Sequence, residues 1–169
     1  MFEFTGGELI ANIYDRITMY EPENLTELGG GVAESWEVSD NGHTITIKIR
    51  PGLKFHSGNP VTAADVEFSL RRAVILNKTP SFILTQFGFT ADNVGDAIVA
   101  DGNTIKIRTD KPYATSFVLN CLTSTIGGIV DMKTVMANEV DGDMGNTWLK
   151  TNSAGSGAYK LVSWKPNES

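Results

Sequence analysis

Two histidines, one cysteine and a few acidic clusters are the side chains in this sequence that could perform catalysis or bind a metal. His56 lies in the stretch RPGLKFHSGNPVTAADVEFSLRRA (residues 50–73), close to Ser57 and Asp65. A hydrolytic site needs a nucleophile, a base and an orienting acid, and these three residue types are present. However, Ser57 belongs to a turn sequence, and Asp65 completes a helix capping box with Thr62. We therefore interpret His56 as a residue of a solvated turn rather than as a catalytic base.

Motifs for metal or nucleotide binding are incomplete. A metal site needs several converging ligands, and His43, the other histidine, sits at the tip of a predicted hairpin. Residues 141–143 (DGD) resemble the start of a calcium loop, but its twelfth position is Asn152 instead of a glutamate. The glycine-rich run at residues 155–159 precedes a predicted strand, whereas a dinucleotide loop follows one. We expect no metal and no cofactor.

Cys121 is the single cysteine of the chain. Its surroundings, SFVLNCLTST, favour a small buried side chain over a reactive thiol. One cysteine cannot form an internal disulfide, so cysteine usage leaves the compartment open. We expect that the chain is not an enzyme; the alternative is an uncharacterised enzyme that uses Cys121 or His56.

The composition fits a folded, acidic protein. Hydrophobic residues make up 41% of the 169 residues, and the net charge is −6 with 14 scattered lysines and arginines. Nucleic-acid binding needs a basic stripe that displaces counterions, so we expect no nucleic-acid partner. No apolar run reaches the ~20 residues of a membrane span. Both ends look cut, and the N-terminus does not read as a signal peptide.

The elements that would hold these residues mix helices with antiparallel hairpins. In residues 44–50 (TITIKIR), three isoleucines alternate with polar residues, which predicts a strand with one buried face. Hairpin turns are predicted at Asn41–Gly42 and Asp101–Gly102. The fold class is therefore α+β, or mixed α/β. The predicted elements are helices at 8–17, 62–76, 113–122 and 132–138, strands at 33–38, 44–50, 125–130 and 159–164, a hairpin within 97–110, a loop at 20–31 and an irregular segment at 77–96.

One long stretch resembles a known family. VAESWEVSDNGHTITIKIRPGLKFHSGNPVTAADVEFSLRRA resembles the signature region of the bacterial extracellular solute-binding proteins of the oligopeptide, dipeptide and nickel type, the capture subunits of ATP-driven (ABC) importers. Ser57 replaces the usual acid, Val32 the usual leucine and Ala158 the usual proline. The matching residues are Ala33, Trp36, Ser39, Gly42, Arg50, Gly52, Phe55, His56, Gly58, Thr62, Ala63, Asp65, Val66 and Phe68, followed by Lys111–Pro112 and residues 155–161.

The resemblance implies a two-lobed periplasmic-binding-protein-like (class II) fold, of which this chain would hold a small subdomain and flanking parts of the near lobe. We expect residues 1–32 to form the near-lobe N-terminal segment, 33–150 the small α/β subdomain and 151–169 a truncated return strand to the near lobe. Because whole family members are much longer, we expect an excised domain or a truncated chain without the exporting signal and the far lobe.

The resemblance also implies a function. We expect capture of peptides or a similar small solute outside the cytoplasmic membrane and delivery to a membrane permease, from a periplasmic or lipoprotein-anchored position. A nickel chelate, an opine or an oligosaccharide are alternative ligands. Phe82 and Phe87, in the irregular segment after the capped helix, are candidate ligand contacts, although core packing would explain them equally well. Ser124 and Thr125, after the next long helix, are the other candidates.

Overall fold

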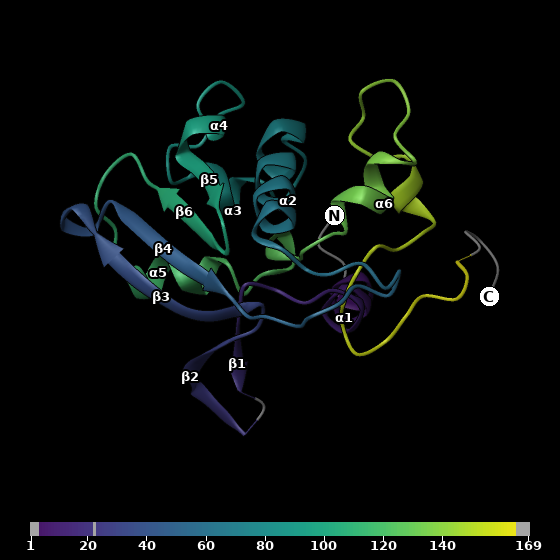
Figure 1. The fold of residues 1–169 in the computed structure, drawn as a ribbon, viewed down its shortest axis with the longest axis horizontal. Coiled ribbons are helices and arrows are strands. Elements are labelled where there is room, and N and C mark those ends of the chain that lie inside the picture. Colours follow the sequence, from purple (N-terminus) through teal and green to yellow (C-terminus); the bar gives the residue numbers. More distant parts are fainter. Residues whose placement is uncertain (1–3, 22, 165–169) are drawn as a thin grey trace.

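The computed structural model describes residues 4–21 and 23–164. A four-stranded antiparallel sheet in the order β3-β4-β6-β5 is covered on one face by helix α2, and a separate two-stranded hairpin, β1-β2, projects from the end of the sheet (Figure 1). The strands are β1 (Thr18–Glu21), β2 (Asn24–Gly30), β3 (Ala33–Ser39), β4 (Thr44–Ile49), β5 (Ile98–Asp101) and β6 (Thr104–Arg108). The helices are α1 (Phe4–Ile13), α2 (Ala63–Leu76), α3 (Phe82–Thr85), α4 (Val94–Ala97), α5 (Thr115–Cys121) and α6 (Met132–Met136), with 3-10 turns at Asp40–Gly42, Thr125–Gly127 and Trp148–Lys150.

The alternating isoleucines set the register of the central strands. Ile45 pairs with Ile107 and Ile47 with Ile105 across β4 and β6, and all four side chains are buried. Because side chains alternate between the faces of a strand, this register places every isoleucine against the same core. The predicted strand in residues 44–50 is confirmed, and so is the hairpin predicted within residues 97–110, which β5 and β6 form.

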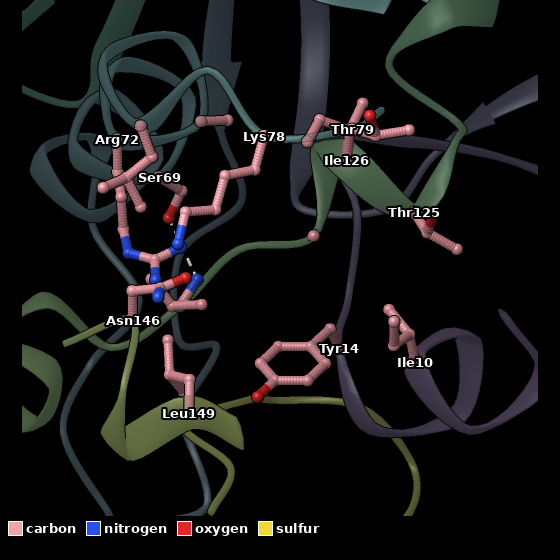
Figure 2. Close-up of a pocket in the computed structure, with 14 residues that line it drawn as sticks. Ile10, Tyr14, Ser69, Arg72, Lys78, Thr79, Thr125, Ile126, Asn146 and Leu149 are labelled. Atoms are coloured by element: carbon pink, nitrogen blue, oxygen red, sulfur yellow. Dashed lines mark hydrogen bonds between the residues drawn. The ribbon is translucent and has the colours of Figure 1, made fainter. Parts of the chain in front are cut away.

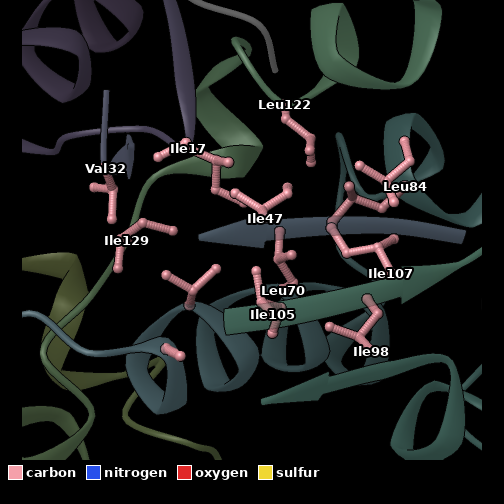
Figure 3. Close-up of a cluster of buried hydrophobic side chains, with 14 of the residues drawn as sticks. Ile17, Val32, Ile47, Leu70, Leu84, Ile98, Ile105, Ile107, Leu122 and Ile129 are labelled. Atoms are coloured by element: carbon pink, nitrogen blue, oxygen red, sulfur yellow. The ribbon is translucent and has the colours of Figure 1, made fainter. Parts of the chain in front are cut away.

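Helix α2 starts where the capping box predicts. The Thr62 hydroxyl accepts a hydrogen bond from the backbone N–H of Asp65, and the Asp65 carboxylate accepts one from the backbone N–H of Thr62. Val66, Leu70 and Val74 then face the sheet and are fully buried. These residues join the isoleucines in one continuous core (Figure 3). The helix therefore has a fixed start and a fixed rotation about its own axis.

Two predictions in the N-terminal segment were wrong. Helix α1 begins and ends four residues earlier than the predicted range 8–17, so Ile17 lies beyond the helix and is fully buried. The predicted loop at residues 20–31 contains strand β2. Its glycines are needed for close approach between backbones: a Cβ on Gly30 would lie 2.1 Å from the Ala33 carbonyl oxygen, and one on Gly31 would lie 2.2 Å from that of Arg16.

Two predicted strands in the C-terminal part were also wrong. Residues 125–130 begin as a 3-10 turn and do not form a strand ladder. Isolated backbone contacts join them to the N-terminal segment, such as the hydrogen bond from the Ile129 N–H to the Asp15 carbonyl oxygen at 2.9 Å. Residues 159–164 form no strand; Tyr159 donates its N–H to the Asn12 carbonyl oxygen at the end of α1, at 3.0 Å. The return segment predicted at residues 151–169 is described only up to residue 164, so its residues 165–169 lie outside the described part. No helix in residues 4–21 and 23–164 is long and apolar enough to cross a membrane.

Candidate functional site

A pocket of about 270 Å³ opens where α1, α2 and the turn at Thr125–Gly127 meet the loop before residue 150 (Figure 2). These four segments are far apart in the sequence, and only the tertiary fold brings them together. The residues that line the pocket are Ile10, Tyr14, Ser69, Arg72, Ala73, Leu76, Lys78, Thr79, Thr125, Ile126, Gly128, Val130, Asn146 and Leu149.

One side of the pocket is apolar. In Figure 2, Ile10 and Tyr14 stand across from Leu149, with Ile126 above them. The Tyr14 hydroxyl accepts a hydrogen bond from the backbone N–H of Ala154 at 3.3 Å, which ties the wall of the pocket to the return segment. Burial raises the pKa of Tyr14, so its hydroxyl stays protonated at neutral pH.

The other side is cationic. Arg72 comes from the last turns of α2, and Lys78 follows the end of that helix. The Arg72 Nε–H donates to the Met144 carbonyl oxygen at 2.7 Å, so the guanidinium is held in place. Burial lowers the pKa of Arg72 from its very high ordinary value, and attraction from nearby groups opposes this effect. Arginine remains protonated under such conditions, so a full positive charge stays in the pocket.

The floor of the pocket is fixed by a side chain on α2. The Ser69 hydroxyl donates to the Asp65 carbonyl oxygen one turn earlier at 2.6 Å, and accepts the backbone N–H of Val130 at 2.9 Å. Both bonds are buried, so little water competes for them. This pair of hydrogen bonds holds the backbone at Val130 against the helix that supplies Arg72.

Asp131 connects the pocket floor to the His56 turn. Its carboxylate accepts hydrogen bonds from the Ser57 hydroxyl at 2.6 Å, the Asn59 amide at 2.9 Å, and both the hydroxyl and the N–H of Thr134 at 2.6 and 3.0 Å. Burial raises the pKa of Asp131, but these hydrogen bonds outweigh burial and hold the pKa below its usual value. Asp131 is therefore charged and belongs to the framework beside the pocket.

His56 is a structural residue, but it is not solvated as the sequence suggested. Its Nε2 lies 2.7 Å from the Gly157 carbonyl oxygen, and its backbone N–H donates to the Gly155 carbonyl oxygen at 2.9 Å. A carbonyl can only accept, so the proton sits on Nε2. The buried Nδ1 has no partner among the described residues. Since both bonds reach the return segment, His56 joins the turn to residues 155–157, while the Ser57 hydroxyl donates its hydrogen bond to Asp131.

The four predicted ligand contacts lie in different surroundings. Thr125 lines the pocket, whereas the hydroxyl of neighbouring Ser124 donates to the Cys121 carbonyl oxygen at 2.6 Å. Phe82 on α3 is 57% exposed and lies outside the pocket lining. Phe87 is only 1% exposed. The structure thus brings Thr125 to the pocket and separates it from both phenylalanines.

Phe87 stands in an aromatic cluster of the core. Its ring lies 5.0 Å from that of Tyr113 and 5.6 Å from that of Phe117, in edge-to-face geometry. Aromatic pairs at such separations stabilise a core beyond their buried area. The packing of Phe87 favours the core interpretation that the sequence left open.

The sequence did not identify Tyr14, Arg72 or Lys78 as site residues. Arg72 lies off the apolar face that carries Val66, Leu70 and Val74, and this spacing is the one local signal that its side chain faces something other than the sheet. Nothing in the sequence showed that α1 and residues 146–149 would close around it. The pocket is therefore a product of tertiary structure.

Cys121 and the acidic residues offer little support for catalysis or metal binding. Burial raises the pKa of the Cys121 thiol, and a hydrogen bond from Gln86, with a 3.6 Å separation between Nε2 and Sγ, only partly offsets this. A raised pKa disfavours the reactive thiolate. Within the described ranges, no three His, Cys, Asp or Glu side chains are grouped so that they could hold a metal ion.

Comparisons with known proteins agree on one family. A probable D,D-dipeptide-binding periplasmic protein of Escherichia coli is 28% identical over 158 residues, covering 92% of this chain and 28% of that protein. The di/tripeptide-binding protein 1 of Pseudomonas aeruginosa is 32% identical over 117 residues, which is 64% of this chain and 20% of the relative. The chain thus spans less than a third of the length of these relatives.

Solved structures share the fold. The ABC transporter-associated periplasmic binding protein DppA of Helicobacter pylori, in complex with the peptide STSA, superposes with a TM-score of 0.77 at 24% identity, over 99% of this chain and 34% of that one. The NikZ protein of Campylobacter jejuni in complex with Ni(L-His) gives a TM-score of 0.70 at 25% identity, over 94% and 29%. These neighbours have the class II periplasmic-binding-protein fold, and this chain covers a part of it.

The family model itself covers most of the chain. The description of the family is "Bacterial extracellular solute-binding proteins, family 5 Middle", and it matches residues 27–169. Members of this family are binding proteins rather than enzymes. The chain belongs to the bacterial extracellular solute-binding proteins of family 5.

Proposed function

We propose that this chain is the near-side part of a solute receptor of an ABC importer, which captures a peptide or similar small solute outside the cytoplasmic membrane and passes it to the permease. The single observation that carries the proposal is the match of the family across residues 27–169. The pocket between α1, α2 and the turn at Thr125–Gly127 supports it, because a concave site with apolar walls and a few fixed polar groups is the usual form of a small-molecule site.

The same family membership supports a division of the chain. We propose that residues 1–32 and 151–169 belong to the near lobe of the receptor and residues 33–150 to a small subdomain. Two hydrogen bonds fit such an arrangement. The bond between Tyr14 and Ala154 joins the two lobe segments to each other, and the bond between His56 and Gly157 joins the subdomain to the second lobe segment. Closure of two lobes over the ligand would remove it from water.

Family relatives leave several ligand classes open for this protein. Their names include dipeptide, glutathione, nickel–histidine and opine ligands. We place peptides first because the curated relatives with sequence similarity are peptide binders, while nickel chelates, opines and oligosaccharides are the alternatives. A periplasmic or lipoprotein-anchored location follows from the same reasoning, as does a role without turnover.

Isothermal titration calorimetry tests the proposal on the protein expressed together with the coding sequence that flanks this chain in its gene. The panel consists of a mixture of short peptides, nickel–histidine, an opine and a neutral oligosaccharide. Saturable binding of one class, with no chemical change in the ligand recovered afterwards, supports a receptor. Release of a cleaved or modified ligand would contradict the proposal and favour an enzyme. Loss of that activity in a His56→Ala or a Cys121→Ala variant would then show which of the two residues the enzyme uses.

A further inference from the structure

The pocket carries an unbalanced positive charge. Its lining includes Arg72 and Lys78 but no aspartate or glutamate, in a chain whose net charge is −6. Walls that exclude water concentrate the field of charges inside a pocket. An anionic group that enters this space therefore meets a favourable potential that the rest of the acidic chain does not provide.

Arg72 is held in position but its hydrogen-bonding capacity is not used up. Only Nε has a partner, the Met144 carbonyl oxygen, and within residues 4–21 and 23–164 the two terminal nitrogens have none. Asp143 attracts Arg72 electrostatically, yet its carboxylate is occupied by the N–H groups of Gly145 and Thr147 at 2.8 and 2.7 Å. The free edge of the guanidinium is the fork that binds a carboxylate through two parallel hydrogen bonds.

The neighbouring arginine, Arg71, lies outside the pocket lining, and its guanidinium is bound by partners within the chain. Arg71 forms an ion pair with Glu67 at 2.5 Å, and its Nε and Nη2 donate to the Ile98 and Gly95 carbonyl oxygens. Arg71 thus uses both Nε and Nη2 in the packing of α2 beside the sheet. Arg72, one residue later, points to the other side of the helix and keeps its terminal nitrogens available.

Lys78 adds a second cation at the same end. Its ammonium has no hydrogen-bonding or acidic partner among the described residues, and its side chain extends toward the Arg72 side of the pocket in Figure 2. In Figure 2, Ile10 and Tyr14 stand across the pocket from these two cations, and Leu149 lies below Arg72. A ligand that fits both ends has an anionic head and an apolar body.

We propose that this pocket selects small solutes that carry a free carboxylate next to an apolar group, with Arg72 and Lys78 as the residues that bind the carboxylate. The inference rests on the proposed function, and it narrows the ligand: a peptide with a free C-terminus or an acidic opine fits, whereas a neutral oligosaccharide does not. A volume of about 270 Å³ suits one or two amino-acid residues rather than a long peptide.

Nuclear magnetic resonance titration of the isotope-labelled 169-residue chain tests this with two probes of nearly the same shape. N-acetyl-leucine has a carboxylate, and N-acetyl-leucinamide replaces it with a neutral amide. At millimolar concentrations, N-acetyl-leucine should shift the Arg72 Nε–H signal and the Tyr14 ring signals. The neutral probe should bind at least tenfold more weakly, because charge-assisted hydrogen bonds are about twice as strong as neutral ones.

Variants assign the effect to the two cations. Lys78→Gln should weaken N-acetyl-leucine binding about two- to fivefold, as for an exposed charge pair, whereas Lys133→Gln, at an exposed lysine outside the pocket, should leave it unchanged. Arg72→Lys keeps the charge but loses the fork, and should weaken binding more than Lys78→Gln does. Unchanged Phe87 ring signals show that a variant is folded.

Two results would overturn the inference, and they differ in what they mean for the proposed function. Equal shifts from both probes would show a pocket that binds solutes without selecting a carboxylate, so the receptor function would survive. No shift from either probe would remove the carboxylate site, and would also take away the pocket's support for solute binding, leaving the receptor function to the calorimetry of the longer protein.

Discussion

Asp131 provides a sharp test of the framework around the pocket. Its side chain is 1% exposed and accepts four hydrogen bonds from the His56 turn and from the first turn of α6. Asp131→Ala removes a charged acceptor and the N-cap of α6 together. We expect it to destabilise the chain without creating a large cavity, because the side chain is small.

The magnitude follows from the kinds of bond that are lost. Hydrogen bonds to a charged group contribute about 1.5–3 kcal/mol each, and an N-cap about 1 kcal/mol. Water can replace some partners, because Ser57, Asn59 and Thr134 are only partly buried or exposed. We therefore expect a loss of about 2–4 kcal/mol in the free energy of unfolding. With a urea m-value of about 2 kcal/mol/M, the unfolding midpoint should fall by about 1–2 M.

The pH dependence gives the second half of this test. The pKa of folded Asp131 is lowered, so its contribution is fully present above the ordinary aspartate value and is lost as the pH falls through the lowered folded value. The difference between wild type and Asp131→Ala should therefore be large at pH 7 and shrink in acid. Urea unfolding monitored by tryptophan fluorescence measures both, with Asp92→Ala, at an exposed aspartate, as the control. A cost no larger than that of Asp92→Ala would refute the argument.

Three further predictions test the elements beside the pocket. Thr62→Ala should cost about 1 kcal/mol in urea unfolding through loss of the α2 cap, and His56→Ala should cost at least as much, because it breaks the bond to Gly157; a cost near zero for His56→Ala would contradict the placement of that ring. A chelator should leave the melting temperature unchanged, and a drop of several degrees would reveal a structural metal. At micromolar concentrations the 169-residue chain should show no saturable binding of short peptides by calorimetry, since each 1.4 kcal/mol of missing contacts weakens binding tenfold. Sedimentation should test whether its exposed Val162 and Trp164 drive self-association.

Local signals predicted the elements whose structure depends on local chemistry. The capping box of Thr62 and Asp65 fixed the start of α2, and the alternating isoleucines of residues 44–50 fixed the buried face of β4. In both cases the determining contacts lie within a few residues, or follow from the two-residue period of a strand. The family resemblance, which the comparisons confirm, rests on the same region.

Predictions failed where a distant backbone decides the conformation. Gly30 and Gly31 indicated a loop, although they are required because the Ala33 and Arg16 carbonyls pass within 2.1 and 2.2 Å of a would-be Cβ. Residues 159–164 had a strand-like pattern but run beside the end of α1, and Val162 is 95% exposed. A strand needs a partner, and no sequence pattern shows whether one is present.

The candidate site was only partly within reach of the sequence. Thr125 was named and lines the pocket, but Tyr14 and Arg72 were not, because their roles depend on how α1 and α2 approach each other. Phe87 illustrates the opposite case: its type and position left a ligand contact and core packing equally open, and its ring packs against Tyr113 and Phe117 in the core. Residue type alone does not separate a pocket wall from a core.

The most direct test of the central claim is to fill the pocket of the longer protein, expressed with the coding sequence that flanks this chain. Thr125→Trp places a bulky side chain at a position that lines the pocket, and Asp92→Trp places the same side chain on the exposed surface as a control. Calorimetry with the solute class that the unmodified protein binds should show binding lost or weakened at least tenfold in Thr125→Trp and unchanged in Asp92→Trp. Equal binding by both variants would contradict the claim that this chain captures solute in the pocket between α1, α2 and the turn at Thr125–Gly127.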